Sequence, residues 1–326
     1  MITQFRTQLR KSQAWVFLRN AQMEGIQKAA RRYYLWSQIL KTDPIATDPV
    51  GTSSHPEIHL LCYWRDYLPA LWSLKSFYWH SGVRYPAVIH TQGKMPSRAI
   101  RRLTAHLPNA LIVGQTKADQ VVEAYLEKHR LTRLLAARRA NGFMLKLTDF
   151  VLFGGSANLL TLDSDLLFFR QPVELLVGDA APVSTHWFQQ DPTSNYNITE
   201  HYALEQLGVN LQPRINTGIM LFARQHETLD YCDSALADAN VARSTGWIEQ
   251  TLYALWASRS NTVGFLPATY QLSLKPGLRD GAIARHYAGP TRPLLTSEGM
   301  PTLVRQGFLA RRAFVAQPPF RADAAQ

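Results

Sequence analysis

The chain has 326 residues, of which 46% are hydrophobic and 18% charged, a balance that suits a globular protein of one large or two medium domains. Its formal net charge of +11 would attract polyanions such as nucleic acid, acidic lipid head groups or phosphorylated ligands. Two cysteines, Cys62 and Cys232, exclude a disulfide framework and a four-cysteine zinc site. No apolar run approaches the ~18 residues of a membrane span and the N-terminus lacks a signal-peptide pattern, so we expect a cytoplasmic protein.

The N-terminal segment is basic and is predicted to be helical. Residues 1–41 contain no proline and one glycine, and residues 1–42 carry many cations against one acid, Glu24. This composition suits peripheral contact with an anionic membrane, and it equally suits a helix pair that docks on the main domain with its basic side in solvent. Three prolines in residues 42–56 predict a linker. The expected organisation is an extension with linker over 1–50, a main domain over 51–312 and a loosely held tail over 313–326.

Strand-like and helix-like segments alternate in the main domain. This alternation predicts an α/β protein with a single, mostly parallel sheet flanked by helices. The expected strands are 58–64, 87–91, 110–113, 158–162, 166–169 and 215–223, and the expected helices are 68–80, 118–129, 143–152 and 245–257, with a helical turn at 173–176.

An acidic pair, Asp163 and Asp165, follows the apolar segment 159–162 directly. In an α/β sheet, ligands bind beyond the carboxyl ends of the strands, where this pair would lie. Two carboxylates one residue apart can face a single divalent cation, which then binds the oxygens of a diphosphate. The alternative is a solvated turn after a strand, but an apolar run on each side of the pair favours the metal site.

The segment HYAGPTRP places His286, Gly289 and Arg292 close together near the end of the domain. Imidazole is a good third ligand for a metal such as manganese, although carboxylates also suit magnesium. Gly289 would allow close approach of the backbone to a phosphate, and Arg292 could bind its oxygens. A single histidine before a Gly-Pro turn is more often structural, so this assignment depends on the acidic pair.

Four segments in order carry a family resemblance: LLTLDSDLLFF, INTGIMLF, WIEQTLYALW and HYAGPTRP. Together they resemble glycosyltransferase family 8, the glycogenin-like and bacterial lipooligosaccharide galactosyltransferases of GT-A fold, over about residues 57–295. The resemblance implies a Rossmann-like GT-A domain, to which the basic N-terminal segment is an addition. It also implies an enzyme that moves a hexose from a nucleotide sugar, most commonly a UDP-sugar, to a glycan, lipid or protein acceptor. Retention of the anomeric configuration is expected by the same analogy.

The resemblance also implies roles for individual residues. Asp163, Asp165 and His286 would bind Mn²⁺ or Mg²⁺, and the two aspartates, with Glu249 and Gln250 flanking the sugar, would form the catalytic set. The family usually has Asp where Glu249 stands and Lys where Arg292 stands, which puts the shape of the sugar pocket and the geometry of the phosphate contact in doubt. The residues expected to bind the nucleotide sugar are Trp64, Tyr67, Lys146, Ser164, Asn216, Thr217, Gly218, Gly289 and Arg292, with Tyr67 or Trp64 stacking on the base.

Two other classes of function stay open at this point. A phosphatase of the haloacid-dehalogenase type also has Asp-x-Asp after an apolar strand. In that class Thr or Val follows soon after the second Asp, whereas this chain has Leu166 and Leu167 there. A non-catalytic protein that binds nucleic acid or a membrane is suggested by the net charge. The basic residues are scattered and form no recognisable nucleic-acid motif, so no nucleic-acid partner is expected.

Overall fold

The computed structural model describes residues 22, 25–52, 55–178, 181–259 and 263–310. The predicted α/β architecture is confirmed: a seven-stranded sheet has the strand order β3-β2-β1-β4-β7-β6-β8. Strands β3, β2, β1 and β4 are parallel, whereas β7 runs antiparallel to both of its neighbours, β4 and β6. The strands of this sheet are β1 (Glu57–Tyr63), β2 (Ala87–Gln92), β3 (Leu111–Val113), β4 (Asn158–Leu162), β6 (His186–Gln190), β7 (Ile215–Ala223) and β8 (Val263–Phe265).

A second sheet of three short strands lies beside the first, where the sequence led us to expect a single sheet. Its order is β5-β10-β9, with β5 (Leu166–Phe168) antiparallel and β9 (Tyr270–Leu272) parallel to β10 (Ala284–His286). Of these three strands only β5 was indicated by the sequence, as the apolar run 166–169, because three residues give little alternation from which to identify a strand. Because β5 follows Asp165 and β10 ends at His286, this small sheet brings the predicted metal ligands to one place.

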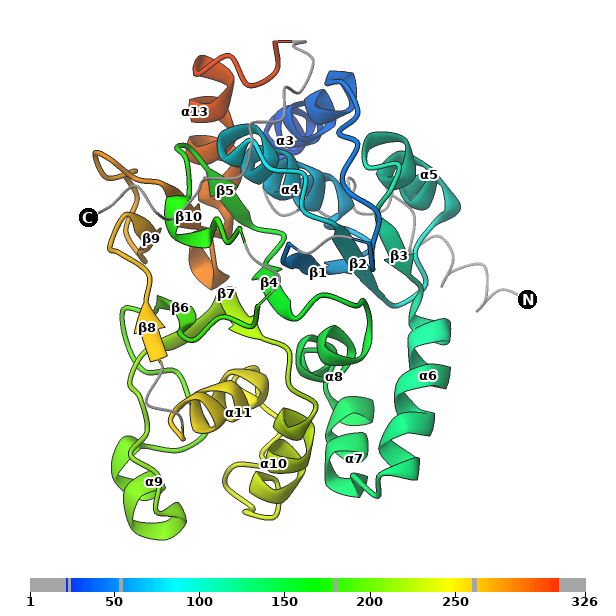
Figure 1. Cartoon of the computed structure of the whole chain (residues 1–326). Helices are drawn as coiled ribbons and strands as arrows, with labels where there is room; N and C mark the ends of the chain where they lie inside the picture. Colours follow the sequence, from blue (N-terminus) through cyan, green and yellow to red (C-terminus); the bar gives the residue numbers. More distant parts are fainter. Residues whose placement is uncertain (1–21, 23–24, 53–54, 179–180, 260–262, 311–326) are drawn as a thin grey trace.

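Helices cover both faces of the large sheet (Figure 1). Side chains alternate between the faces: Leu160 and Leu221 pack into the core cluster that includes α4, whereas Leu159 and Phe222 pack into the cluster that includes α8 and α11. The longer helices are α3 (Ile26–Gln38), α4 (Tyr67–Ser81), α5 (Ser97–His106), α6 (Gln115–Lys128), α7 (Thr132–Ala140), α8 (Met144–Leu152), α9 (Glu200–Leu207), α10 (Glu227–Ala235) and α11 (Ile248–Ala257). Shorter elements are η1 (Ile39–Lys41), η2 (Val173–Leu175), η3 (Gly289–Thr291), α12 (Arg292–Leu294), η4 (Leu295–Gly299) and α13 (Met300–Arg305).

Most predicted elements are confirmed, with ends that differ by a few residues. The strands predicted at 158–162 and 215–223 have the bounds of β4 and β7, and the glycine stop of the first helix is Gly82, with φ 71°. Helices α5, α7, α9 and α10 were not predicted. Helix α5, for example, reads SRAIRRLTAH, and only three of its residues are buried, so its sequence gives a weak apolar signal.

The segment predicted as a linker packs against the domain over its first part. Ile45 and Thr47 are buried, and backbone hydrogen bonds join Ile45 to His106 and Asp48 to Arg84. The prolines prevent this segment from forming a helix, but they do not prevent it from packing on the domain. Residues 45–48 therefore lie against the body, and the role of this segment as a linker between the extension and the main domain stays a prediction.

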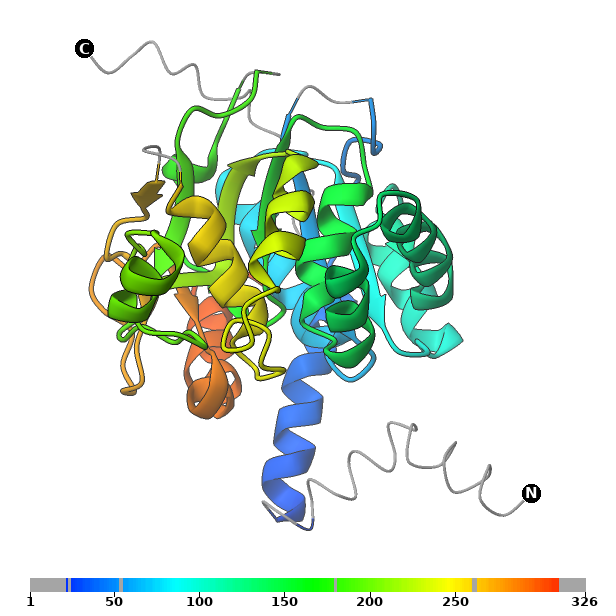
Figure 2. The ribbon, with the colours of Figure 1, turned by 90° about the horizontal axis from the view of Figure 1, so that it is seen from below.

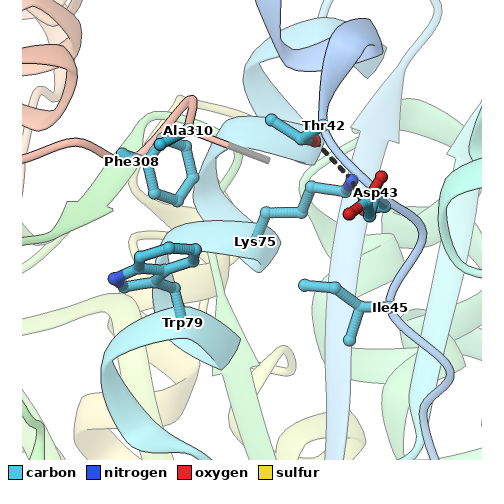
Figure 3. A pocket seen from close by; sticks show the side chains of 7 residues that line it. All are labelled: Thr42, Asp43, Ile45, Lys75, Trp79, Phe308 and Ala310. Atoms are coloured by element: carbon cyan, nitrogen blue, oxygen red, sulfur yellow. Dashed lines mark hydrogen bonds between the residues drawn. The ribbon is translucent and has the colours of Figure 1, made fainter. Parts of the chain in front are cut away.

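Buried Lys75 of α4 ties the same segment to the helices around it (Figure 3). Its Nζ donates to Thr42 Oγ1 at 2.7 Å and to Asp43 O at 2.6 Å, and lies 2.9 Å from His106 Nδ1. Burial lowers the pKa of Lys75 from 10.5 to about 7. Because each proton of the ammonium group has an acceptor, this lysine has a structural role.

Helix α3 confirms the last part of the predicted N-terminal helix; residues 1–21 and 23–24, and the predicted tail from 313 on, lie outside the described residues. Its C-terminal end docks on the body, where Trp36 Nε1 donates to Thr296 Oγ1 at 2.8 Å and Trp72 Nε1 donates to Trp36 O at 3.0 Å. The N-terminal half of α3 projects away from the body (Figure 2). Among the described residues, no helix is long and apolar enough to cross a membrane.

Candidate active site

The turn after β4 is held in place by contacts from three other segments. Asp163 N–H donates to Gly218 O of β7 at 2.9 Å, Ser73 Oγ of α4 donates to Asp163 O at 2.9 Å, and Tyr287 N–H donates to Asp165 O at 2.9 Å. These hydrogen bonds fix the backbone of Asp163 and Asp165, from which both carboxylates extend. The acidic pair is therefore part of the packed framework and is not a loose surface turn.

Asp163, Asp165 and His286 converge, as the sequence predicted. His286 Nε2 lies 3.2 Å from Asp165 Oδ1 and 3.6 Å from Asp163 Oδ2, and one ligand atom from each residue lies within 4.8 Å of the others. The Asp163 side chain is 27% exposed and the Asp165 side chain 14%, whereas His286 is buried. The cluster thus has a buried side and a side open to solvent, through which a ligand could reach it.

The orientation of His286 is set by amide side chains behind it. Nδ1 lies 3.1 Å from Gln189 Oε1 and 3.2 Å from Asn216 Oδ1. Asn216 Oδ1 also accepts a hydrogen bond from Gly218 N–H, so it is an acceptor, and Nδ1 must carry the proton. If a metal ion displaced the second proton of the imidazole, Nε2 would present its lone pair on the side of the carboxylates, which is the arrangement that metal-binding histidines adopt.

Gly218 provides the space that the imidazole occupies. A Cβ added at this glycine would lie 2.3 Å from His286 Cε1 and 2.4 Å from its Nδ1. A larger residue would push the ring away from the aspartates. The glycine expected from the sequence to bind the nucleotide sugar thus contacts a metal-ligand candidate directly.

The electrostatics of the cluster favour a positive charge at Nε2. Burial alone would lower the pKa of His286, but the hydrogen bond to Asp165 and the charges of Asp165 and Asp163 outweigh it and raise this pKa above its usual value. Burial likewise raises the pKa of Asp165, but His286 and Arg292 together lower it below the usual range. Two carboxylates and an imidazole that face one another are a set of ligands that fits Mn²⁺ or Mg²⁺.

Lys146 and Glu249 form a second, buried layer beneath Asp163. Lys146 Nζ lies 2.9 Å from Asp163 Oδ1 and 3.9 Å from Glu249 Oε1, and it donates to Thr217 O at 3.0 Å. Thr217 Oγ1 donates to Glu249 Oε2 at 3.0 Å, whereas Glu249 Oε1 has no hydrogen-bond partner among the described residues. Lys146 was expected to contact the donor; the structure places it against Asp163.

Burial raises the pKa of Glu249 from 4.5 to about 7, although the charge of Lys146 opposes this shift. A carboxyl group that titrates near neutrality is typical of catalytic sites, because it can hold or release a proton at working pH.

Asp191 is a member of the site that the sequence analysis missed. Its Oδ2 accepts hydrogen bonds from Gln250 Nε2 at 3.0 Å and Asn216 Nδ2 at 3.2 Å. It follows β6, a strand that was not predicted, so its place at a strand end was not visible in the sequence. The only available signal was the strand-like run HWFQQ before it.

Arg292 lies beside the acidic pair and approaches Asp165, whereas Lys146 lies against Asp163. The NH2 of Arg292 is 2.9 Å from Asp66 Oδ2, and its Nε is 3.9 Å from Asp165 Oδ2. Asp66, at the start of α4, was also missed. Gly289, with φ 53°, has nothing within 4 Å of the place where a Cβ would lie, so its backbone is open to a ligand.

The two aromatic residues predicted to stack on a base are in the core. Trp64 is 3% exposed and Tyr67 2%, and an Arg102 NH1 group donates to Tyr67 Oη. A guanidinium group covers each ring: Arg65 lies 5.0 Å from the centroid of the Trp64 ring, and Arg102 lies 5.9 Å from that of the Tyr67 ring. Ser164, also assigned to the donor, is 9% exposed.

The solved structures similar to this chain include several glycosyltransferases. The galactosyltransferase LgtC, in complex with donor and acceptor sugar analogues, has a TM-score of 0.49 and 13% identity, over 76% of this chain and 94% of that one. Mouse xyloside xylosyltransferase 1 has a TM-score of 0.45 and 12% identity, over 80% of this chain and 96% of that one.

The bifunctional glycosyltransferase WbbM has a TM-score of 0.46 and 16% identity, over 75% of this chain. The match covers 47% of WbbM, so this chain spans about half of that protein's length. The sequence matches no protein-family model and no curated protein.

Proposed function

We propose that the chain is a metal-dependent glycosyltransferase that takes a hexose from a nucleotide-diphosphate sugar. The observation that carries this proposal is the convergence of Asp163, Asp165 and His286, with Nε2 at 3.2 and 3.6 Å from the two carboxylates. A divalent cation held there would act as a Lewis acid for the departing diphosphate. The protein offers three ligands, and one side of the cluster is open to solvent. Both features support a cation whose remaining coordination positions are taken by phosphate oxygens.

In the proposed reaction, an acceptor hydroxyl oxygen forms a bond to the anomeric carbon. The bond from that carbon to the diphosphate oxygen breaks, and the nucleoside diphosphate leaves with the electron pair. The proton of the hydroxyl passes to the leaving diphosphate or to solvent. Arg292, which approaches Asp165 from the exposed side, would bind diphosphate oxygens, and Lys146 would hold Asp163 in position.

The amide and carboxyl groups of Asn216, Glu249 and Gln250 would orient the donor sugar. Asp191 joins this set through its hydrogen bonds to Asn216 and Gln250. Retention of the anomeric configuration and a UDP-sugar donor are the outcomes that the family resemblance implies for this site. Base stacking on Tyr67 or Trp64 would require either ring to leave the core.

A nucleotide-sugar panel tests the proposal directly. The purified chain is mixed with manganese or magnesium and with UDP-, GDP- and dTDP-hexoses, and thermal unfolding is followed with each pair. One nucleotide sugar should raise the unfolding temperature only when the metal is present, since a ligand that binds the native state stabilises it by mass action. Slow release of the nucleoside diphosphate should accompany that binding.

Two results would reject the proposal. Stabilisation by no nucleotide sugar with either metal would remove its basis, and release of inorganic phosphate from sugar phosphates would favour the phosphatase interpretation. Product stereochemistry is a separate question: an NMR spectrum that shows inversion would reject retention alone and leave the transferase proposal intact.

Peripheral membrane contact through residues 1–42 stays a prediction. The described part of this segment supports it, because α3 projects from the body and exposes Ile26 and Tyr34 among the cations Lys28 and Arg31 (Figure 2). Co-sedimentation with vesicles of anionic phospholipid, for the full chain and for a chain without residues 1–42, should show binding by the full chain alone. Equal binding by both would reject it.

A further inference from the structure

A hollow of about 500 Å³ opens next to the proposed donor site. It is lined by the segment after β8, by β9 and the loop after it, and by the ends of the connections at Asp191 and Arg214. Two contacts join it to the site. Asp191, on its wall, accepts hydrogen bonds from Asn216 and Gln250, and Leu272, also on its wall, is paired in register with the metal-ligand candidate His286.

The charged side chains of this hollow are mostly cations. Arg214, Lys275 and Arg279 line it, and the one carboxylate among its lining residues is Asp191. Asp191 already accepts two hydrogen bonds from the donor-site amides. Among the residues that the structure describes, none of the three cations forms an ion pair with Asp191. A concave surface lined by one sign of charge concentrates ligands of the opposite sign.

The loop that carries Lys275 and Arg279 is anchored from below by a buried cation. Arg285 of β10 is fully buried; its guanidinium donates to Lys275 O at 2.7 Å and Gly277 O at 2.6 Å and pairs with Glu298 at 2.7 Å. Gln271 adds a hydrogen bond in each direction, from Nε2 to Gly277 O and from Arg279 N–H to Oε1. The backbone under both exposed cations is therefore fixed, and less order has to be gained when a ligand binds.

The third cation that lines the hollow, Arg214, also has a defined backbone. Its φ of 59° places it in the left-handed region, and its carbonyl accepts a hydrogen bond from Asp191 N–H at 2.7 Å. Arg214 lies two residues before Asn216, so its position is tied to the strand that carries the donor-site residues. The apolar residues Leu266, Pro267 and Leu274 also line the hollow.

We propose that this hollow is the acceptor subsite and that it selects an acceptor glycan bearing an anionic group, a phosphate or a uronate carboxylate. Arg214, Lys275 and Arg279 bind the anion, while the apolar residues of the hollow contact the carbon-bound faces of the sugar ring. The acceptor hydroxyl then points past Asp191 towards the donor. This inference rests on the proposed glycosyl transfer and adds the chemical class of its second substrate.

The test compares matched neutral and anionic probes on the full chain, saturated with manganese and UDP so that the donor phosphates cannot compete. Glucose, glucose 6-phosphate and glucuronate are titrated by calorimetry at low and at moderate salt. The anionic probes should bind roughly 10-fold or more tightly than glucose, and added salt should reduce the difference, because exposed charges are screened. The variant R214Q/K275Q/R279Q should lose this preference.

A control variant, R101Q/K117Q/K128Q, removes the same charge from exposed positions on α5 and α6 and should keep the preference. Equal binding of all three probes, or a preference retained in R214Q/K275Q/R279Q, would overturn the inference. Vesicles of anionic phospholipid serve as a further arm: a response to the three substitutions with vesicles alone would assign the cations to a lipid surface and overturn the acceptor assignment.

Failure of the inference and failure of the proposed function are separable. Stabilisation by manganese with UDP, GDP or dTDP is measured first for the parent chain and both variants, and the diphosphate that binds replaces UDP in the titrations. If it is absent in the parent chain, the proposed function fails; if it is present and unchanged in R214Q/K275Q/R279Q while the probes show no anion preference, only the acceptor inference fails.

Discussion

Buried charge clusters lie at both ends of the central strands, and they are built differently. At the amino end of β1, Glu57 accepts hydrogen bonds from Arg224 NH2 at 2.7 Å, from Gly155 N–H at 3.0 Å and from Gly51 N–H at 3.2 Å. Glu57 is 1% exposed, so this cluster is closed. At the carboxyl end of β4, Asp163 and Asp165 share Lys146, His286 and Arg292, and both carboxylates remain partly exposed.

This difference is the one expected between a structural ion cluster and a ligand site. A buried charge whose partners all come from the protein holds segments together, and removing one partner leaves the other uncompensated. A cluster of carboxylates that is open on one side can exchange a protein contact for a metal ion. The predictions that follow test this contrast, beginning with the largest expected effect.

Loss of either aspartate should abolish activity and leave the fold intact. We expect D163N and D165N each to lower kcat/KM for glycosyl transfer by about 1000-fold or more, because the leaving diphosphate loses its cation. Circular dichroism and the unfolding temperature without metal should change little. D280N, at an exposed position, is the control and should keep full activity. Activity within tenfold of the parent chain in D163N would contradict the metal assignment.

Substitution of Glu57 should have the opposite effect. E57Q leaves Arg224 buried without its carboxylate, and we expect the free energy of unfolding to fall by about 3–5 kcal/mol. Metal-dependent binding of the nucleotide sugar should persist in the folded fraction. Urea denaturation measures the loss, with E127Q as control, because Glu127 is exposed and its contact with Arg139 is 3.5 Å long. A loss below about 1 kcal/mol would show that the closed cluster contributes little.

Acid should destabilise the closed cluster first. Burial alone would raise the pKa of Glu57, but His59, Gly155 N–H and Arg224 lower it from 4.5 to about 2, whereas burial lowers the pKa of His59 from 6.5 to about 4. Both groups bind a proton more readily in the unfolded chain, so both reduce stability as pH falls. The neighbouring His90, with its pKa also lowered by burial, acts in the same direction.

The pH window follows from these values. The contribution of His59 should be lost between pH 6.5 and about 4, and that of Glu57 between pH 4.5 and about 2. Each shift corresponds to about 3 kcal/mol at most. Urea denaturation at several pH values should show a steep decline below pH 6.5 that is reduced in E57Q below pH 4.5. A flat profile from pH 7 to 4 would contradict the assignment.

Gly218 offers the smallest and most local perturbation. In G218A the new Cβ displaces His286 from the aspartates, and we expect manganese affinity to fall by about 10- to 100-fold with little change in secondary structure. Calorimetric titration of manganese measures this change. The matched control is G246A, since a Cβ at Gly246 meets nothing within 4 Å. Equal manganese affinity in both variants would exclude His286 as a ligand.

Much of the framework of the site was predictable from the sequence, for physical reasons. Strands β4 and β7 are buried over their whole length and most of their residues are apolar, so their ends could be located closely. Because the end of β4 could be located, the position of Asp163 and Asp165 directly after that strand could also be predicted. The convergence with His286 could be predicted only through the order of the motifs, because no local pattern shows which distant strand ends meet.

The missed residues share a cause. Asp191 follows β6, and Asp66 precedes a helix whose faces are all buried; neither segment has a periodicity that marks the neighbouring carboxylate as a site residue. The same burial explains Tyr67. A helix that is apolar all round gives no indication of which aromatic residues face a ligand and which face the core.

The placement of His286 on the last strand of the small sheet has a consequence for how the chain matures during synthesis. Asp163 and Asp165 leave the ribosome long before β10, and β5 has no strand partner until β10 and β9 are made. A nascent chain that stops short of His286 therefore displays the two carboxylates on an unpaired edge. The proposed ion site would therefore form only after β10 has been synthesised, and a product truncated before Ala284 would lack the imidazole of the cluster.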